Sequence, residues 1–310
     1  MQDNQSKSPL QRITLVMVLL NAFTTPLMLS AVNVALPAIA TDLSMNAVLI
    51  SWVPMAYLMA SAMFVLIFGR IADMVGRKRI FLLGTASVIV TSLIAAFAIN
   101  GTMLISARFL QGVSAAMLYA TQVAIVSSVF PPAKRGQAIG LTVSTIYLGL
   151  TIGPLIGGYV IDSFGWRASF MVHIPLAIIV LCVGLFFVKG DWSADERGSF
   201  DLFGALLYAL SILMICIGVS FLPAYSSFIF LGVAMLGFIF FFLFERVHKH
   251  PIFDVSLFFT NRVFTFSCLA SLIMYTATFA NVVQVSLYLQ YLKELSATTA
   301  GMVMMCQPLT

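Results

Sequence analysis

Nine long apolar stretches, separated by short polar or charged connections, constrain this chain more than any other feature. Most reach or approach the about 20 residues that an α-helix needs to cross a bilayer. Helices and closed barrels alone satisfy their backbone polar groups inside lipid, and stretches of this length favour helices. The sequence therefore predicts an all-α membrane protein with about nine complete spanning helices. The stretches cover residues 13–36, 48–69, 80–99, 102–128, 138–161, 168–188, 202–222, 226–244 and 264–290.

The distribution of charge predicts the orientation of these helices. Only 9% of the residues are charged, against about 25% in a typical soluble domain. The connections after even-numbered stretches and the N-terminal segment hold most of the basic residues, whereas the opposite side has only Arg167 and Lys293. By the positive-inside rule, the N-terminus is expected in the cytoplasm, with the protein in a cytoplasmic or bacterial inner membrane. The net charge of +5 is then explained by the orientation of the helices in the membrane, and no nucleic-acid partner is expected.

The lengths of the connections divide the chain into blocks. A six-helix bundle is predicted over residues 1–188 and a cytoplasmic linker over 189–200. An additional helix pair is expected over 201–245 and a cytoplasmic loop over 246–263. Residues 264–310 are expected to begin a further bundle, with a tenth helix that starts near Ala297 and is cut by the end of the chain. A short re-entrant or surface helix is the alternative for that last segment.

An ordered set of glycine, acidic and basic residues lies between the second and third stretches. It comprises Gly69, Asp73, Gly76, Arg77 and Lys78. Glycine permits a tight turn and close backbone approach, and a carboxylate near the membrane surface can face the positive end of a helix. The alternative, a basic loop that only anchors the protein at the membrane surface, would explain the basic residues. It would not explain the ordered glycines and the aspartate. The set therefore predicts a gating loop.

Arg108 is the only charged residue well inside any of the apolar stretches. An arginine near the bilayer centre costs roughly 2.5–3.5 kcal/mol, so it normally faces a protein interior or a wet cavity. At 100° per residue, Gln111, Tyr119 and Gln122 fall with Arg108 within an arc of about 60° on one helix face. This stripe is predicted to line a cavity, and a purely structural hydrogen-bonded helix interface is the alternative.

Within the fifth stretch, residues 149–158 hold four glycines and a proline in an ordered pattern. Gly149, Gly153 and Gly157 share one helix face, which permits another helix to pack backbone to backbone. Pro154 removes a backbone hydrogen bond and bends the helix, and Gly158 completes the pattern. Ordinary helix packing is the alternative to a specialised role in transport.

These three motifs resemble signatures of the major facilitator superfamily, namely G-x-x-x-D-x-x-G-R-[KR] at 69–78, an arginine with a Q-G pair at 108–112, and the antiporter signature G-x-x-x-G-P-x-x-G-G at 149–158. The segments 33–37 and 165–175, with the helix pair after a short linker, resemble the fourteen-helix drug:proton antiporter group. The resemblance covers essentially the whole chain. It implies a bundle of the major facilitator type, with export of substrate by alternating access.

One position departs from that resemblance. The group normally carries an aspartate, implied to be the proton carrier, nine positions before Pro37, which is expected to end the first helix; here Met28 occupies it. Asn21 and Thr25 share the face of Met28, so a mildly polar wall without a titrating group is expected there. His173 stands where the group usually has asparagine, and we expect a polar cap, with titration near neutral pH as the alternative.

The sequence thus predicts a secondary active transporter, expected to be monomeric, for multidrug or other small hydrophobic or amphipathic compounds. An uncoupled facilitator and a non-transporting membrane sensor remain alternatives. The expected partners are a small-molecule substrate, protons as the candidate coupling ion, and the lipid bilayer. No enzymatic activity, cofactor or metal is expected, because no catalytic cluster or metal-ligand spacing is present. The predicted cavity residues are Arg108, Gln111, Tyr119, Gln122, Asn33, Asn21, Thr25 and Met28.

Overall fold

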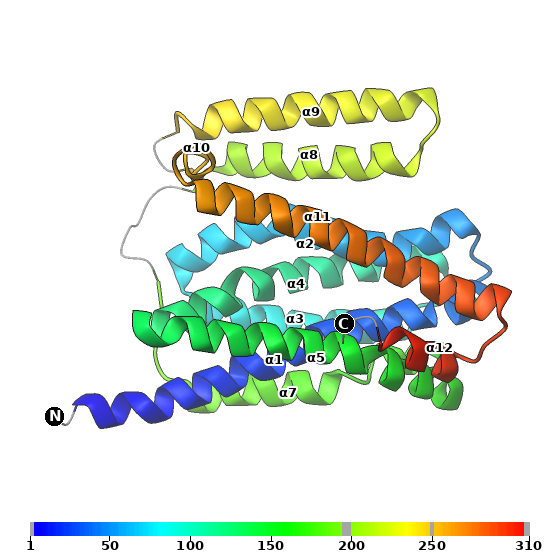
Figure 1. The fold of residues 1–310 in the computed structure, drawn as a ribbon, viewed down its shortest axis with the longest axis horizontal. Helices are drawn as coiled ribbons and strands as arrows, with labels where there is room; N and C mark the ends of the chain where they lie inside the picture. Colours follow the sequence, from blue (N-terminus) through cyan, green and yellow to red (C-terminus); the bar gives the residue numbers. More distant parts are fainter. Residues whose placement is uncertain (1–2, 194–199, 249–250, 307–310) are drawn as a thin grey trace.

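Long helices run side by side along one direction in the computed structural model, which describes residues 3–193, 200–248 and 251–306 (Figure 1). Within these residues, nine helical segments are long and apolar enough to cross a membrane, which confirms the predicted all-α membrane bundle. The elements are α1 (Asp3–Asp42), α2 (Ala47–Val75), α3 (Arg77–Ala96), α4 (Gly101–Val129), α5 (Pro132–Phe164), α6 (Trp166–Ser169), α7 (Ile174–Cys182), the π-helical turn η1 (Val183–Phe187), α8 (Leu202–Ser220), α9 (Tyr225–Glu245), α10 (Leu257–Thr260), α11 (Arg262–Leu287), the π-helical turn η2 (Tyr288–Leu292) and α12 (Ala297–Met304).

The first helix is longer than predicted. The expectation that it ends at Pro37 is wrong, because α1 continues to Asp42. A proline removes one backbone hydrogen bond, and neighbouring groups can compensate for that loss inside a membrane bundle. Beyond Pro37, the Thr41 hydroxyl donates to the Pro37 carbonyl at 3.1 Å. At the end of the helix, Asp42 accepts bonds from Trp166 Nε1 at 3.0 Å and Arg167 Nη1 at 2.7 Å.

The first six spanning segments pack around two buried apolar clusters. α1 packs along α5, α4 lies between α2 and α3, and α7 packs against α3 and α1. One cluster, near the end where α1 terminates, includes Leu36, Leu104 and Phe170. The other, toward the N-terminal end of α1, includes Phe81 and Ile125. Buried apolar side chains thus hold the helices together on both sides of the polar residues that lie midway along the bundle.

Helices α8 and α9 form an antiparallel pair at the edge of this bundle (Figure 1). α8 packs on α2, and the Tyr208 hydroxyl donates to the Ala62 carbonyl at 3.1 Å. Many apolar side chains of the pair are exposed, Phe228, Met235 and Leu236 among them. A lipid bilayer would cover such side chains, since apolar surface of this extent is rare on soluble proteins.

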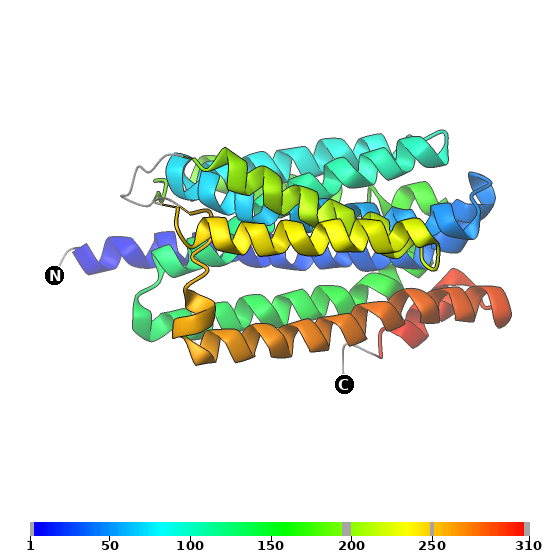
Figure 2. The ribbon, with the colours of Figure 1, turned by 90° about the horizontal axis from the view of Figure 1, so that it is seen from above.

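The last described helices pack on α1 and α5. α11 packs on α1, and Figure 2 shows it along one edge of the molecule, with α12 folded back at its end. The Ser286 hydroxyl of α11 donates to the Asn33 carbonyl of α1 at 3.0 Å. Gln290 Nε2 of η2 donates to the Val34 carbonyl at 3.0 Å. α12 packs along the end of α5.

Candidate functional site

The guanidinium of Arg108 lies inside the helix bundle with none of its surface exposed. Its Nη1 donates to Gln111 Oε1 at 2.5 Å, and its Nε donates to the Val53 carbonyl of α2 at 3.2 Å. The guanidinium carbon lies 4.3 Å from the centre of the Tyr57 ring, a distance at which a cation is attracted to the aromatic face. Nη2 has no hydrogen-bond partner. Neutral dipoles and a ring, with no carboxylate among these contacts, therefore accommodate the charge.

A chain of hydrogen bonds leads from Arg108 across α3 to α7. Gln111 Nε2 donates to Ser92 Oγ at 2.7 Å and also lies 3.0 Å from Met28 Sδ. Ser92 Oγ in turn lies 3.0 Å from His173 Nε2. All four polar side chains are buried. Groups from three helices are thus joined in one network, which includes contact with α1 at Met28.

Close approach of α2 and α4 makes this arrangement possible. A Cβ atom added to Gly112 would clash with the Tyr57 carbonyl, so only glycine lets the two backbones meet there. The Arg108 side chain therefore reaches the backbone of α2. The other members of the predicted stripe have partners as well: the Tyr119 and Tyr57 hydroxyls lie 2.9 Å apart. Gln122 Oε1 accepts a bond from Asn21 Nδ2 at 3.2 Å.

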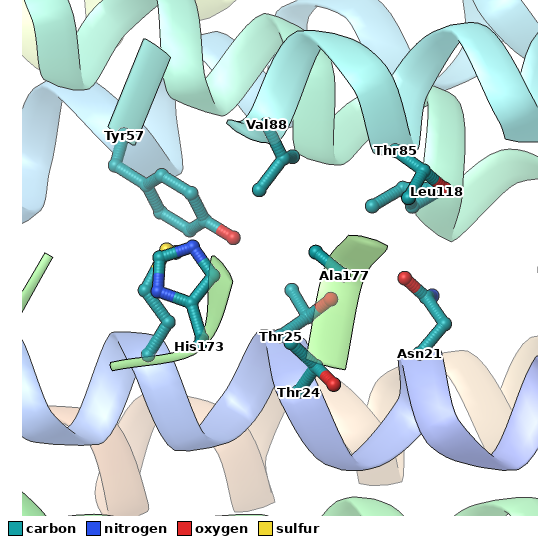
Figure 3. Close-up of a pocket in the computed structure, with 10 residues that line it drawn as sticks. Asn21, Thr24, Thr25, Tyr57, Thr85, Val88, Leu118, His173 and Ala177 are labelled. Carbon is teal, nitrogen blue, oxygen red and sulfur yellow. The ribbon is translucent and has the colours of Figure 1, made fainter. Parts of the chain in front are cut away.

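A small enclosed cavity of about 10 Å³ lies among α1, α2, α3, α4 and α7 (Figure 3). Such a volume accommodates roughly one water molecule. Three predicted cavity residues line it, Asn21, Thr25 and Met28. The other five, Arg108, Gln111, Tyr119, Gln122 and Asn33, are not among the residues that line this cavity. Arg108 bonds the Val53 carbonyl of α2, and Gln111 bonds Ser92 of α3. The other lining residues are Thr24, Tyr57, Thr85, Val88, Leu118, His173 and Ala177.

The His173 side chain does not have the role that was expected of it. The residue precedes the first turn of α7, yet its side chain makes no capping hydrogen bond. The prediction of a polar cap is wrong, since the ring packs inward against Ser92 and lines the cavity. Sequence reasoning missed Ser92, because a serine within an apolar run carries no distinguishing local signal.

A larger hollow of about 320 Å³ opens between α1, α2 and the α11–η2 helix. Its lining is almost entirely apolar, and none of the predicted site residues contributes to it. The volume falls at the lower end of the range of small-molecule pockets. The lining residues are Leu36, Ala40, Met45, Ala47, Ile50, Ser51, Val283, Leu287 and Tyr291.

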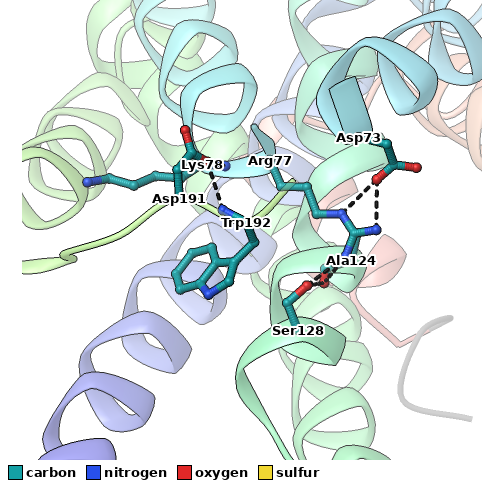
Figure 4. A network of polar contacts seen from close by, with 7 residues as sticks. All are labelled: Asp73, Arg77, Lys78, Ala124, Ser128, Asp191 and Trp192. Atoms are coloured by element: carbon teal, nitrogen blue, oxygen red, sulfur yellow. Dashed lines mark hydrogen bonds and ion pairs between the residues drawn. The ribbon is translucent and has the colours of Figure 1, made fainter. Parts of the chain in front are cut away.

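The predicted gating loop ties α2 to α4 (Figure 4). Arg77 donates through Nε to Asp73 Oδ1 at 2.8 Å, and its Nη2 lies 2.7 Å from the same oxygen. Arg77 Nη1 donates to Ser128 Oγ at 2.6 Å and to the Ala124 carbonyl at 3.3 Å. A Cβ atom added to Gly69 would lie 4.0 Å from Ala120 Cβ, an ordinary contact distance. One arginine thus joins the end of α2 to the last turns of α4.

The connection after the sixth spanning segment docks on this loop, which sequence reasoning did not predict. Asp191 Oδ1 accepts from the Lys78 backbone N–H at 3.0 Å, and Asp191 Oδ2 lies 3.0 Å from Arg79 Nε. The Trp192 carbonyl accepts from the Arg77 backbone N–H at 2.8 Å, and Lys78 Nζ donates to the Val188 carbonyl. The available signal in the sequence was Asp191, an acidic residue in a connection on the side where basic residues predominate.

Gly76 adopts a conformation that this docking requires. Its φ is +124°, which L side chains rarely adopt. An added Cβ would also collide with the carboxylate of Asp191. Gly76 therefore permits both the turn between α2 and α3 and the approach of the linker.

The glycines of α5 serve two different interfaces. Added Cβ atoms at Gly149, Gly153 and Gly157 would collide with α1, at the Phe23 carbonyl, at Ser30 and at Ala31 respectively. On another face, a Cβ at Gly158 would strike the Ala297 carbonyl of α12, and one at Gly301 would strike the Pro154 carbonyl. Asp162 Oδ2 accepts bonds from the Thr298 backbone N–H at 2.9 Å and from its hydroxyl at 2.6 Å. One motif thus places both α1 and α12 against α5.

Across the residues that the structure describes, no group of three His, Cys, Asp or Glu side chains is placed to hold a metal ion. The polar groups of the site are instead amides, hydroxyls, one guanidinium and one imidazole. Such groups can bind and orient the polar parts of a small molecule.

The comparisons with known proteins agree with this architecture. The model of the Major Facilitator Superfamily matches residues 18–309. The riboflavin transporter RibZ of Clostridioides difficile (strain 630) is 33% identical over 96% of this chain and 65% of its own length. The multidrug export protein EmrB of Escherichia coli (strain K12) is 29% identical over 96% of this chain and 60% of its own. The multidrug resistance protein Stp of Mycobacterium tuberculosis (strain CDC 1551 / Oshkosh) is 32% identical over 80% and 47% respectively.

The chain therefore spans between 47% and 65% of the length of these three relatives. Among solved structures, a peptide transporter POT in complex with sulfate matches 96% of this chain and 65% of its own, with a TM-score of 0.68. At 15% identity, that likeness concerns the fold alone.

Proposed function

The chain belongs to the Major Facilitator Superfamily, and on that premise we propose that the protein is a secondary active transporter that exports small hydrophobic or amphipathic compounds. The observation that carries the proposal is the buried Arg108 network, which extends from α4 through α3 to a cavity on α1 and α7. A bilayer protein accommodates a buried cation at a cost, and such groups mark substrate and ion pathways.

Hydrophobic or amphipathic compounds are supported as substrates by the apolar hollow between α1, α2 and α11. The names of the relatives EmrB and Stp refer to multidrug export or resistance, and RibZ is named for riboflavin. Riboflavin has a planar ring system and lipophilic drugs have an apolar body, and an apolar lining would contact either one. Multidrug efflux is the broader proposal, and riboflavin is a specific candidate within it.

The proposed movement is alternating access between a first bundle, residues 1–188, and the segment from residue 264 onward. The linker 189–200, the pair 201–245 and the loop 246–263 would connect them. The contact of α5 with α12 at Gly158 supports this division, because close packing of small residues gives a tight seal that can separate as a unit. In this proposal Asp73, Arg77 and Lys78 close the opposite end.

The orientation is proposed from the clustering of basic residues at one end of the bundle. Gln11 Nε2 donates to the Val129 carbonyl at 3.1 Å, and Arg77 bonds Ser128, so the start of α1, the α2–α3 turn and the end of α4 meet. By the positive-inside rule this end lies in the cytoplasm, with the N-terminus. We further propose that the protein lies in a bacterial inner membrane and functions as a monomer.

Protons are the proposed coupling ion, with transport as antiport. Met28 favours a second candidate, an uncoupled facilitator, because a thioether on α1 cannot carry a proton. A membrane sensor that binds the same compounds without moving them would share the fold. Dependence of flux on a pH gradient separates antiporter from facilitator, and binding without flux identifies the sensor.

The test is transport by the full-length protein reconstituted in proteoliposomes, with ethidium and riboflavin as probes. We expect concentrative flux under an imposed pH gradient, and at least a tenfold loss in Arg108→Ala and in Asp73→Asn. Asp254→Asn is the matched control, because the Asp254 carboxylate accepts bonds from the backbone N–H and the hydroxyl of Ser256 within the same loop. Normal flux in both site variants would overturn the assigned roles, and binding without flux in the parent would overturn the transporter.

A further inference from the structure

His173 is a buried imidazole to which the proposed function assigns no role of its own. None of its surface is exposed, and its Nδ1 has no hydrogen-bond partner. Its Nε2 lies 3.0 Å from Ser92 Oγ. A buried polar atom without a partner normally costs free energy, so its retention calls for an explanation.

The hydrogen bonds around Ser92 determine which nitrogen of the ring carries the proton. Ser92 Oγ donates its single proton to the Val88 carbonyl at 2.6 Å. The same oxygen accepts a bond from Gln111 Nε2, which can only donate because Gln111 Oε1 accepts from Arg108. The remaining lone pair of Ser92 Oγ is then free to accept from His173 Nε2–H. In a neutral ring this leaves Nδ1 as a bare acceptor.

The ring also borders the water-sized cavity (Figure 3). The cavity wall offers the hydroxyls of Thr24, Thr25 and Tyr57 and the amide of Asn21. A cavity of this size and polarity can hold a single water with several hydrogen bonds. A water in this cavity would lie beside the imidazole and could exchange a proton with it.

The groups that face His173 make it the base of this region. From α1 come Asn21, Thr25 and Met28, and from α3 come Ser92 and Thr85, none of which gains a proton near neutral pH. The ionisable groups are Tyr57 of α2, its partner Tyr119 of α4, and Arg108 of α4. Tyrosine and arginine do not accept a proton in the physiological range, whereas imidazole does.

We propose that His173 is the proton-binding residue of this transporter, with Nδ1 as the atom that takes up and releases the proton. The proposal rests on the proposed antiport. The proton comes from water on one side of the membrane and leaves to water on the other, with no other bond made or broken. A second positive charge, three hydrogen bonds away from the Arg108 cation, would disfavour the closed packing, since like charges repel strongly at low dielectric.

The first test needs no transport. The chain has three histidines, so a His248→Gln, His250→Gln background leaves His173 as the sole labelled ring. With ¹⁵N-histidine in lipid bilayers, we expect the Nε2–H tautomer at pH 8 and a doubly protonated ring that grows between pH 7 and pH 5. A ring that keeps one neutral tautomer throughout this range would overturn the proposal.

The second test measures coupling in proteoliposomes of the full-length protein, again with ethidium and riboflavin. We expect His173→Asn to lose at least tenfold of the accumulation driven by a pH gradient, while exchange of probe at equal pH continues and so reports a folded carrier. His248→Gln is the control, because His248 follows α9 and faces Asp201, outside the network. Adding Met28→Asp to His173→Asn should restore part of the accumulation, because residue 28 lines the same cavity.

The outcomes separate this inference from the proposed function. Full accumulation by His173→Asn would overturn the inference and leave the antiporter intact. Flux in the parent that ignores the pH gradient would overturn the antiport, and with it the coupling role of His173. In that case the ¹⁵N titration still decides whether the ring binds a proton.

Discussion

Asp191 accepts a hydrogen bond from the backbone N–H of Lys78 at 3.0 Å, which attaches the connection after the sixth spanning segment to the first turn of α3. The bond acts as a cap supplied from outside the helix, because Gly76 at the N-terminal boundary has no side chain. The same carboxylate pairs with Arg79. The predicted gating loop and residues 188–192 therefore form one structural unit at this end of the bundle.

We predict that Asp191→Ala raises hydrogen exchange at the amides of residues 78–81 about fivefold, since loss of a cap costs about 1 kcal/mol. Asp191→Asn should have a smaller effect, because it keeps an acceptor for Lys78 and loses only a partly exposed ion pair. Asp254→Ala is the control, because the Asp254 carboxylate bonds Ser256 within its own loop. Unchanged exchange in Asp191→Ala would show that the linker does not stabilise the loop.

Arg108→Lys is predicted to slow probe flux at least tenfold while the protein still inserts and folds. Lysine keeps the charge but lacks the planar fork that reaches both the Val53 carbonyl and Gln111. Flux is measured in proteoliposomes at equal protein content. Arg262→Lys, at the exposed start of α11, is the matched control. Parental flux in Arg108→Lys would mean that charge alone is sufficient at this position.

The glycine face of α5 gives a prediction about stability with an internal control. Gly149→Ala should destabilise the protein by about 1–3 kcal/mol, because its Cβ would push against the backbone of α1 at Phe23. Gly136→Ala lies in the same helix with nothing within 4 Å, and should be neutral or slightly stabilising. Thermal unfolding in detergent distinguishes the two. Equal unfolding temperatures would contradict the assignment of this face.

A disulfide between α5 and α12 is predicted to stop transport. Thr298 Oγ1 lies 2.6 Å from Asp162 Oδ2, so cysteines at both positions should form a cross-link under mild oxidation. The four native cysteines are first replaced by serine. Flux should fall on oxidation and return on reduction. Asp162→Cys with Thr299→Cys is the control, since Thr299 bonds Ser296 within its own turn. Full flux in the cross-linked protein would exclude opening at this contact.

Much of the fold follows from local sequence, but the ends of its elements do not. The spanning helices were predictable because each apolar stretch must hydrogen-bond its own backbone in lipid. The end of α1 was mispredicted at Pro37, because contacts of Asp42 with Trp166 and Arg167 extend the helix. Those partners lie more than a hundred residues away and leave no trace in local periodicity.

The candidate site divides in the same way. The stripe of Arg108, Gln111, Tyr119 and Gln122 was visible from helical spacing, whereas the direction in which each side chain turns was not. Arg108 turns to a backbone carbonyl of α2, which no side-chain pattern could reveal. His173 was visible only as a lone histidine near the start of a helix.

The sequence by itself determined the membrane-spanning character of the chain, the buried cation in the fourth span and the small-residue face of the fifth. These are properties of single helices, each set by the exchange of water for lipid. The tertiary structure alone decided that Ser92 links Gln111 to His173, and that Asp191 meets Lys78. Such contacts depend on how closely helix backbones approach, and that distance is a product of packing among helices far apart in the chain.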